Sequence, residues 1–312
     1  MRSLCLLAAS LALAAAPLGA QKLFVTTTSL VNVAFSAHTA LGGLVTGLQA
    51  GDLSVTENGV PQTIAFFSPA PQMPLTLGII LDMSGSQHDS LKQHRYDLER
   101  FLGHLLTPDD HAFLVGFADH IRLLSDYTSY SPSLLWALDH YRSRYAYPLL
   151  GPLSGPNADR DGGTALYDAI DYAITEKMAR QPGRRALLVF SDGEDNSSAH
   201  DEQDAVTAAE NNDTTIFTVR YTEDHKWDSS DVQGMEVMNH LASATGGRAV
   251  DARRVQPAVY LAAIAGELRA SYDLAYYPHG DSAPGYRRIL IRCHRPGVII
   301  SARAGYTPHS PD

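Results

Sequence analysis

The strongest constraint on the fold is an apolar run, Leu75-Thr76-Leu77-Gly78-Ile79-Ile80-Leu81, that ends at Asp82. A strand with one face in water alternates apolar and polar residues, so a continuous apolar run fits a central parallel strand that is buried on both faces. From this run to about residue 270, short β-type runs alternate with segments of helical period. The alternation predicts a doubly wound α/β domain with a mostly parallel sheet.

This α/β domain is expected to span residues 74–270. Its predicted strands are 75–81, 112–118, 121–124, 186–190, 215–219 and 249–251. Its predicted helices are 90–106, 134–145, 165–177, 202–211, 235–245 and 257–270. The helix at 235–245 is followed by Gly246-Gly247, and glycine is a common helix stop.

Two β-rich segments flank this domain. In 21–73 we predict strands at 23–28, 31–35 and 53–57, then an Asn58-Gly59 hairpin turn and a return strand at 63–67. In 271–312 we predict strands at 272–277, 287–293 and 298–303. Neither segment has enough strands to bury a core by itself, so we expect the two to pair into one small β-sandwich-like module. Two separate β appendages are the alternative.

The first twenty residues have the pattern of a secretory signal peptide. Arg2 gives a positive start, residues 4–16 are apolar apart from Ser10, and cleavage is expected after about Ala20. The alternative is a membrane anchor, but the apolar stretch is shorter than the roughly 20 residues that a span needs. We therefore expect an exported protein, periplasmic, at the cell surface or secreted, with no membrane span after cleavage.

Composition excludes several other classes of protein. The 312 residues carry 24 basic and 34 acidic side chains, a net charge of −10, which becomes −11 once Arg2 is removed. A nucleic-acid binder usually has a basic face, so we expect no nucleic-acid partner. Cys5 leaves with the signal peptide and Cys293 remains alone, which excludes a disulfide-rich scaffold.

Five oxygen-bearing side chains follow predicted strands or open a predicted helix, where α/β sheets place their ligands. They are Asp82, Ser84 and Ser86 after the first strand, Thr164 before a helix, and Asp192 after the strand at 186–190. Hard oxygen ligands favour Mg²⁺, Ca²⁺ or Mn²⁺ over zinc or copper. The alternative for each residue taken alone is a helix cap or an ordinary turn, as in a metal-free relative.

In this pattern the chain resembles the von Willebrand factor type A domain family. Asp82-x-Ser84-x-Ser86, Thr164 and Asp192 match the metal-ion-dependent adhesion site of the family in type and order. The flanking β segments make the whole chain similar to an exported group of this family first described in Acidobacteria.

The resemblance implies a role for each residue. Ser84, Ser86 and, in the ligand-engaged state, Thr164 would bind the ion directly, whereas Asp82 and Asp192 would do so directly or through water. One coordination position would remain for an Asp or Glu of a protein partner. The family usually has Met after the last serine, and Gln87-His88 stands here; we expect this change to alter surface recognition and leave metal binding intact.

The leading prediction is thus a metal-dependent adhesion or protein-binding module that is not an enzyme. A metal-independent structural component of an envelope assembly is the first alternative. A metal-dependent hydrolase is less favoured, because a haloacid-type phosphohydrolase needs a second Asp where Ser84 stands and no Gly-x-Ser-x-Gly motif surrounds the serines. Glu194 and Asp195 are read either as a second cation site or, preferably, as an acidic rim.

Overall fold

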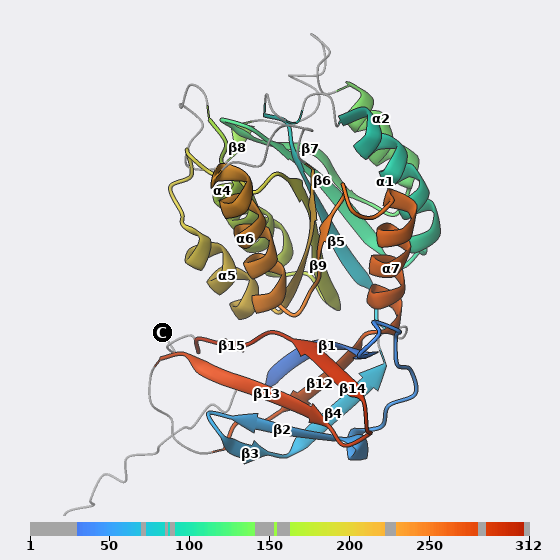
Figure 1. The fold of residues 1–312 in the computed structure, drawn as a ribbon, viewed down its shortest axis with the longest axis vertical. Coiled ribbons are helices and arrows are strands. Elements are labelled where there is room, and N and C mark those ends of the chain that lie inside the picture. The colour runs from blue at the N-terminus through green and yellow to red at the C-terminus, as the bar shows by residue number, and fades with distance from the viewer. Residues whose placement is uncertain are drawn as a thin grey trace, which may run out of the picture.

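The computed structural model describes residues 30–69, 73–84, 87, 91–140, 153–154, 163–221, 229–279 and 285–308. The predicted signal peptide, the predicted strand at 23–28 and the last residues of the helix predicted at 134–145 lie outside these ranges. Figure 1 shows a three-layered α/β domain, with helices on both faces of a sheet, above a smaller module of strands. No helix within the described ranges is both long and apolar enough to cross a lipid bilayer.

The sheet of the α/β domain has seven strands in the order β11-β10-β9-β5-β6-β7-β8. The strands from β11 to β6 are parallel, and β7 and β8 are added antiparallel at one edge. Their bounds are β5 Leu75–Asp82, β6 His111–Phe117, β7 Ile121–Thr128, β8 Leu153–Ser154, β9 Arg184–Ser191, β10 Thr214–Arg220 and β11 Ala249–Asp251. The prediction of a mostly parallel, doubly wound sheet is therefore confirmed.

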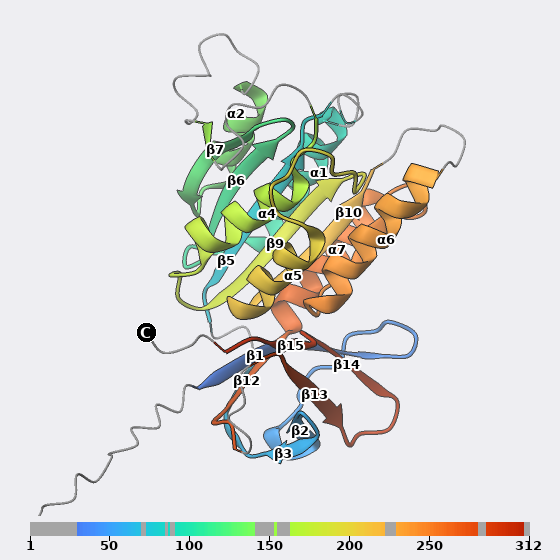
Figure 2. The same cartoon turned by 90° about the vertical axis from the view of Figure 1, so that its left-hand side faces the viewer.

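Helices cover both faces of this sheet (Figures 1 and 2). One face carries α1 Leu91–Leu105, α2 Ser131–His140 and α7 Pro257–Ala270. The other carries α4 Leu166–Tyr172 with its π-helical continuation η4 Ala173–Met178, α5 Glu202–Asn211 and α6 Ser229–Ala244. Both helix layers bury apolar side chains against the sheet in separate core clusters.

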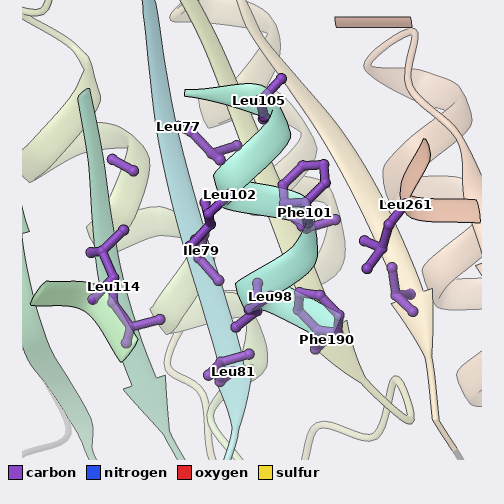
Figure 3. Packing of buried hydrophobic residues seen from close by; sticks show 14 of the residues in the cluster. Leu77, Ile79, Leu81, Leu98, Phe101, Leu102, Leu105, Leu114, Phe190 and Leu261 are labelled. Carbon is purple, nitrogen blue, oxygen red and sulfur yellow. The ribbon is translucent and has the colours of Figure 1, made fainter. Parts of the chain in front are cut away.

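The central strand β5 is buried along its whole length. Leu77, Ile79 and Leu81 pack against the apolar side of α1 on one face, as Figure 3 shows, and Ile80 points into the other core cluster. At Gly78 a Cβ atom would come within 2.7 Å of the Phe113 ring. Burial on both faces explains why the sequence of β5 does not alternate between apolar and polar residues. It also holds β5 in place, so that Asp82 stands at the carboxyl end of the sheet.

The β module consists of two four-stranded sheets, ordered β14-β1-β12-β4 and β15-β13-β2-β3. Each sheet combines strands from both ends of the chain, which alternate in the first sheet but not in the second, and all the pairings are antiparallel. The bounds are β1 Val31–Thr39, β2 Leu53–Glu57, β3 Val60–Gln62, β4 Ile64–Pro69, β12 Tyr272–Tyr276, β13 Arg287–Cys293, β14 Val298–Ala302 and β15 Gly305–Tyr306, with a short 3₁₀ turn η1 at Ala50–Asp52. Apolar side chains of both sheets form one core, which confirms the β-sandwich-like module.

The β module packs against the end of the α/β domain at which β5 and β9 begin. Ser36 on β1 donates a 2.7 Å hydrogen bond to Glu267 on α7. Arg303, after β14, donates to the carbonyl of Asn32 at 2.6 Å and pairs with Asp213 at 2.7 Å, just before β10. The opposite, carboxyl end of the sheet therefore faces away from the module.

Two element predictions are wrong in detail. The Asn58-Gly59 turn has positive φ at both residues, so the return strand begins at once, as β3 Val60–Gln62, and not at 63. The chain then changes sheet, and β4 pairs with β12. Helix α6 begins at Ser229, before the predicted start at 235, and continues through Gly234.

Candidate metal centre

The carboxyl ends of β5 and β9 lie side by side in the middle of the sheet. The two strands are parallel neighbours, with Leu81 opposite Phe190. Asp82 is the last residue of β5, and Asp192 directly follows β9. The parallel register therefore brings together two predicted site residues that are 110 positions apart in the sequence.

Asp82 is fully buried and both of its carboxylate oxygens accept hydrogen bonds. The backbone N–H of Ser84 donates to Oδ1 at 2.9 Å, and the hydroxyl of Ser191 donates to Oδ2 at 2.7 Å. The first bond bends the chain after β5 so that Ser84 follows Asp82 into the same loop. The second holds the Asp82 carboxylate against the end of β9.

Asp192 is also nearly buried and is held from two sides. Its Oδ1 accepts the backbone N–H of Glu194 at 3.1 Å, and its Oδ2 accepts the side-chain amide of Gln87 at 3.0 Å. The same amide nitrogen of Gln87 donates to the carbonyl of Tyr221 at 3.0 Å. Gln87 thus links the loop after β5 to the ends of β9 and β10.

This position of Gln87 corrects the expectation that it alters surface recognition. Its side chain is only 1% exposed. The backbone N–H of Gln87 donates to the carbonyl of Ser84 at 3.1 Å, and this turn directs the amide inward, onto Asp192. Gln87 is therefore a neighbour of a predicted ligand and not a surface residue.

Thr164 reaches the same edge of the sheet from the loop before α4. Its N–H donates to the side chain of Asn196 at 2.8 Å, and its carbonyl accepts the N–H groups of Asn196 and Ser197 at 3.1 and 3.2 Å. The preceding Gly163 has φ of +118°, and a Cβ there would lie 2.6 Å from the Asn196 side-chain oxygen. The next residue, Ala165, bonds to the carbonyl of Ala118 just beyond β6. The loop after Asp192 therefore positions Thr164.

Four of the five predicted site residues thus lie at one edge of the sheet. Ser84 donates a hydrogen bond to Asp82, and the charge of Asp192 acts on the Asp82 carboxylate. Thr164 is bonded to the loop that follows Asp192. The fifth, Ser86, lies outside the described residues.

The oxygen atoms gathered here suit a hard divalent cation. Burial and the nearby Asp192 carboxylate raise the pKa of Asp82 to about 7, because two carboxylates with little water between them repel each other. A cation between them would offset this repulsion. The hydroxyl of Ser197, whose N–H donates to the Thr164 carbonyl, is buried and has no hydrogen-bond partner. It is therefore a further oxygen near Thr164 that could interact with a cation or with its bound water.

Carboxylates alone do not complete a metal site in this part of the molecule. Within the described ranges, no group of three or more His, Cys, Asp and Glu side chains could hold a metal ion. A site at this edge therefore has to combine the two carboxylates with hydroxyl or water oxygens, as Mg²⁺ and Ca²⁺ sites commonly do.

Several residues that support the site are not among the five residues predicted from the sequence motif. Ser191 and Gln87 bond to the two aspartates directly, and Arg220 at the end of β10 donates from Nε to the backbone carbonyl of Asp192 at 3.2 Å. Asn196 fixes Thr164. Only Ser191 and Gln87 lie next to motif residues in the sequence, and that adjacency is the one hint the sequence offers.

Comparison with known protein families identifies the α/β domain. Residues 77–256, more than half of the chain, match the von Willebrand factor type A domain. No curated protein sequence matches the chain.

Three of the solved structures that resemble this chain have low sequence identity to it. An aerotolerance-related membrane protein from Bacteroides fragilis is 16% identical, with a TM-score of 0.45, over 62% of this chain and 98% of that one. A von Willebrand factor type A protein from Catenulispora acidiphila is 13% identical, with a TM-score of 0.43, over 91% and 76%. Proximal thread matrix protein 1 from the mussel byssus, solved with a zinc-occupied adhesion motif, is 12% identical, with a TM-score of 0.44, over 69% and 50%.

Proposed function

Because this chain belongs to the von Willebrand factor type A domain family, we propose that it is an exported module that binds a protein partner through a divalent cation. Domains of this family generally mediate protein–protein interaction. The observation that carries the proposal is the pair of buried carboxylates, Asp82 and Asp192, at the carboxyl edge of the sheet and beside the hydroxyl-bearing Ser84 and Thr164.

The residues have separate tasks in this proposal. Ser84, Thr164 and Ser86, the last assigned from the sequence alone, offer hydroxyl oxygens to Mg²⁺, or to Ca²⁺ or Mn²⁺. Asp82 and Asp192 supply negative charge directly or through water. A bound cation supplies an electrophilic position at which a carboxylate of the partner can coordinate. Ser191 and Gln87 would hold the two aspartates in place through their hydrogen bonds to them.

The fold supports such a role by placing the β module at the end of the sheet opposite the candidate site. The β module occupies the opposite end of the sheet, and β5, with eight residues, separates the two ends by about 25 Å at 3.3 Å per residue. A partner could therefore dock on the carboxyl edge without meeting the module. Export is proposed from the signal-peptide pattern of residues 1–20 alone.

The test is recovery of a partner from a native envelope extract with the tagged protein, with Mg²⁺ or with EDTA, followed by identification of the bound proteins. The proposal expects a protein that is retained with Mg²⁺, released by EDTA and lost with the Asp192→Asn variant. Asp139→Asn is the matched control, because Asp139 pairs with Arg95 on the exposed surface.

Two other outcomes would favour the alternatives. A partner that is retained equally with Mg²⁺, with EDTA and with Asp192→Asn would indicate a metal-independent structural component. Metal-dependent turnover of phosphate or ester substrates, lost with Asp82→Asn, would indicate a hydrolase.

A further inference from the structure

The loop of residues 192–201 joins β9 to α5, which lies beside α4 in Figure 2. Asn196, in the middle of this loop, holds Thr164 through the hydrogen bonds described above. The contacts that fix the loop therefore also fix Thr164, a predicted metal ligand. Beyond Asn196, these contacts lead to a single histidine, His200.

Asp168 in α4 is the main anchor of this loop. Its carboxylate is buried and accepts the backbone N–H groups of Ala199 and His200, each at 3.0 Å. Nδ1 of the His200 ring lies 2.7 Å from the same carboxylate, and because an ionised carboxylate can only accept, Nδ1 carries a proton. The backbone N–H of Asp168 in turn donates to the hydroxyl of Ser198 at 3.0 Å. The loop and the first turn of α4 are thus bonded in both directions.

The second ring nitrogen of His200 faces a second carboxylate. Nε2 lies 3.8 Å from Asp171, which follows Asp168 along α4. Proton uptake at Nε2 would therefore place a cation between these two carboxylates, and the charge of Asp204 on α5 favours the same uptake. The side chain of His200 is 35% exposed, so the proton can come directly from solvent.

Two acidic residues that follow His200 in the sequence have partners of their own. Asp201 caps α5 by accepting the N–H of Asp204 at 2.9 Å, and Glu202 lies 2.5 Å from His240 on α6. The charged groups that act on the His200 ring are therefore the carboxylates of α4 and of Asp204, and all of them favour the protonated ring.

We propose that His200 is a pH-sensitive clamp: a proton bound at Nε2 ties the loop of residues 192–201 more firmly to α4 and thereby steadies Thr164 at the candidate metal centre. Hydrogen bonds between charged partners are stronger than neutral ones. Burial disfavours the charged ring, but the hydrogen bond to Asp168 and the charge of Asp171 outweigh burial and raise the pKa of His200 above 6.5. The added stability is present below pH 6.5, the pKa in the unfolded chain, and is lost as the pH rises through the pKa in the folded protein.

The clamp deepens the proposed function by making the position of Thr164 depend on pH, and only its biological effect rests on that function. Mg²⁺ affinity is a poor measure of the clamp, because protonation of Asp82, whose pKa is about 7, would lower that affinity over the same pH range. Within the described ranges, His200 and its two carboxylates form no group that could hold a metal ion. The experiment is therefore done in EDTA, and its outcome is independent of the metal centre.

The test combines an NMR titration of the histidine rings with amide hydrogen exchange in the full mature chain, between pH 5.5 and pH 8.5. The ring of His200 should titrate above pH 6.5. Over the same transition, the N–H groups of Thr164, Asn196 and Ser197 should lose about tenfold of their protection from exchange, after correction for the intrinsic exchange rate. Tenfold is the scale of one weakened charge-assisted hydrogen bond.

His200→Asn keeps an amide donor near the place of Nδ1 but cannot gain charge, so the loss of protection with rising pH should disappear. His240→Asn is the matched control, because His240 also pairs with a carboxylate but lies on α6, and it should leave the loss unchanged. A His200 ring that titrates at or below pH 6.5, constant protection in the wild type, or the same loss in His200→Asn would overturn the proposal. The two wild-type measurements decide the question even where the variant fails to fold.

Discussion

Gly193 and Gly234 pack backbone against backbone, and neither position has room for a side chain. A Cβ on Gly193 would lie 2.9 Å from the Cα of Gly234, and a Cβ on Gly234 would overlap the carbonyl oxygen of Asp192. The loop that carries Asp192 therefore rests directly on α6. This contact also explains why α6 passes through a glycine, a residue that is unfavourable inside a helix.

We predict that Gly234→Ala destabilises the protein although alanine is the better helix former. The clash with Asp192 should cost about 1–3 kcal/mol, the usual range for an overpacked site. Gly103→Ala is the matched control, because a Cβ at Gly103 in α1 meets nothing within 4 Å and should stabilise by about 0.5–1 kcal/mol. Urea unfolding measures both. Equal stabilisation by the two changes would contradict the close contact of Asp192 with α6.

His94 on α1 should make the protein sensitive to acid. Its ring is fully buried, neither ring nitrogen has a hydrogen-bond partner, and it packs on Tyr221 and Phe190 with centroids 4.3 and 5.1 Å away. Burial lowers the pKa of His94 from 6.5 to about 3. Between these values the unfolded chain takes up a proton that the folded protein does not, so the free energy of unfolding falls as the pH falls through this window. Above pH 6.5 the loss is absent.

Urea unfolding at pH 7 and pH 5 measures this effect. Wild type should lose about 2 kcal/mol more than His94→Phe between the two pH values, because each pH unit below 6.5 costs up to about 1.4 kcal/mol. His111→Phe, a change at an exposed histidine at the start of β6, should lose as much as the wild type. The same loss in His94→Phe as in the wild type would show that another group causes the acid sensitivity.

Arg303 should be the most important single side chain in the contact between the β module and the α/β domain. It is 8% exposed and bonds to Asn32 in the module and to Glu210 and Asp213 in the domain. Asp213 is 24% exposed and keeps its 3.5 Å ion pair with Arg185. Arg303→Ala therefore removes the closer of two ion pairs, together with the donor to the Asn32 and Glu210 carbonyls, and should cost about 1–3 kcal/mol. Arg292→Ala, at an exposed position of β13, should change stability by less than about 0.5 kcal/mol. Thermal unfolding distinguishes the two, and a small effect of Arg303→Ala would mean that apolar contacts alone hold the module.

Gln87 should tune the candidate metal centre without being a ligand. Gln87→Ala removes the amide that holds Asp192 and the Tyr221 carbonyl. Loss of such an outer partner commonly lowers metal affinity about 10–100-fold. Gln93→Ala is the control, since the side-chain amide of Gln93 donates to Asp97 on the same helix, α1. If Gln87→Ala binds Mg²⁺ as tightly as the wild type, Gln87 has no positioning role.

The sequence predicted the arrangement of the sheet well because its central strands are buried on both faces. The apolar run that ends at Asp82 fits a strand that is buried on both faces, and its short length separates it from the helices. The hairpin return was misplaced because its three residues, Val60–Gln62, include Pro61 and form only a short edge strand. The start of α6 was missed because the packing of Gly234 against Asp192 is a tertiary contact that no local pattern reveals.

For the candidate site, the motif residues could be predicted but their supports could not. Asp82 and Asp192 stand at strand ends, which periodicity locates. Gln87 and Arg220 reach Asp192 because of the direction of their side chains and the order of the strands in the folded sheet. The spacing of residues along the chain reveals neither the direction nor the order. The expectation that Gln87-His88 alters surface recognition did not include the inward contact of Gln87 with Asp192 for this reason, and His88 lies outside the described residues.

Direct titration of the metal-free mature chain with Mg²⁺ by calorimetry tests the central claim most directly. Wild type should bind one Mg²⁺ ion, Asp82→Asn and Asp192→Asn should each weaken binding by about a hundredfold or more, and Asp139→Asn should bind as the wild type does. Absence of saturable binding of Mg²⁺, Ca²⁺ and Mn²⁺ to the wild type, or unchanged affinity in both Asp82→Asn and Asp192→Asn, would contradict a metal centre at this edge of the sheet.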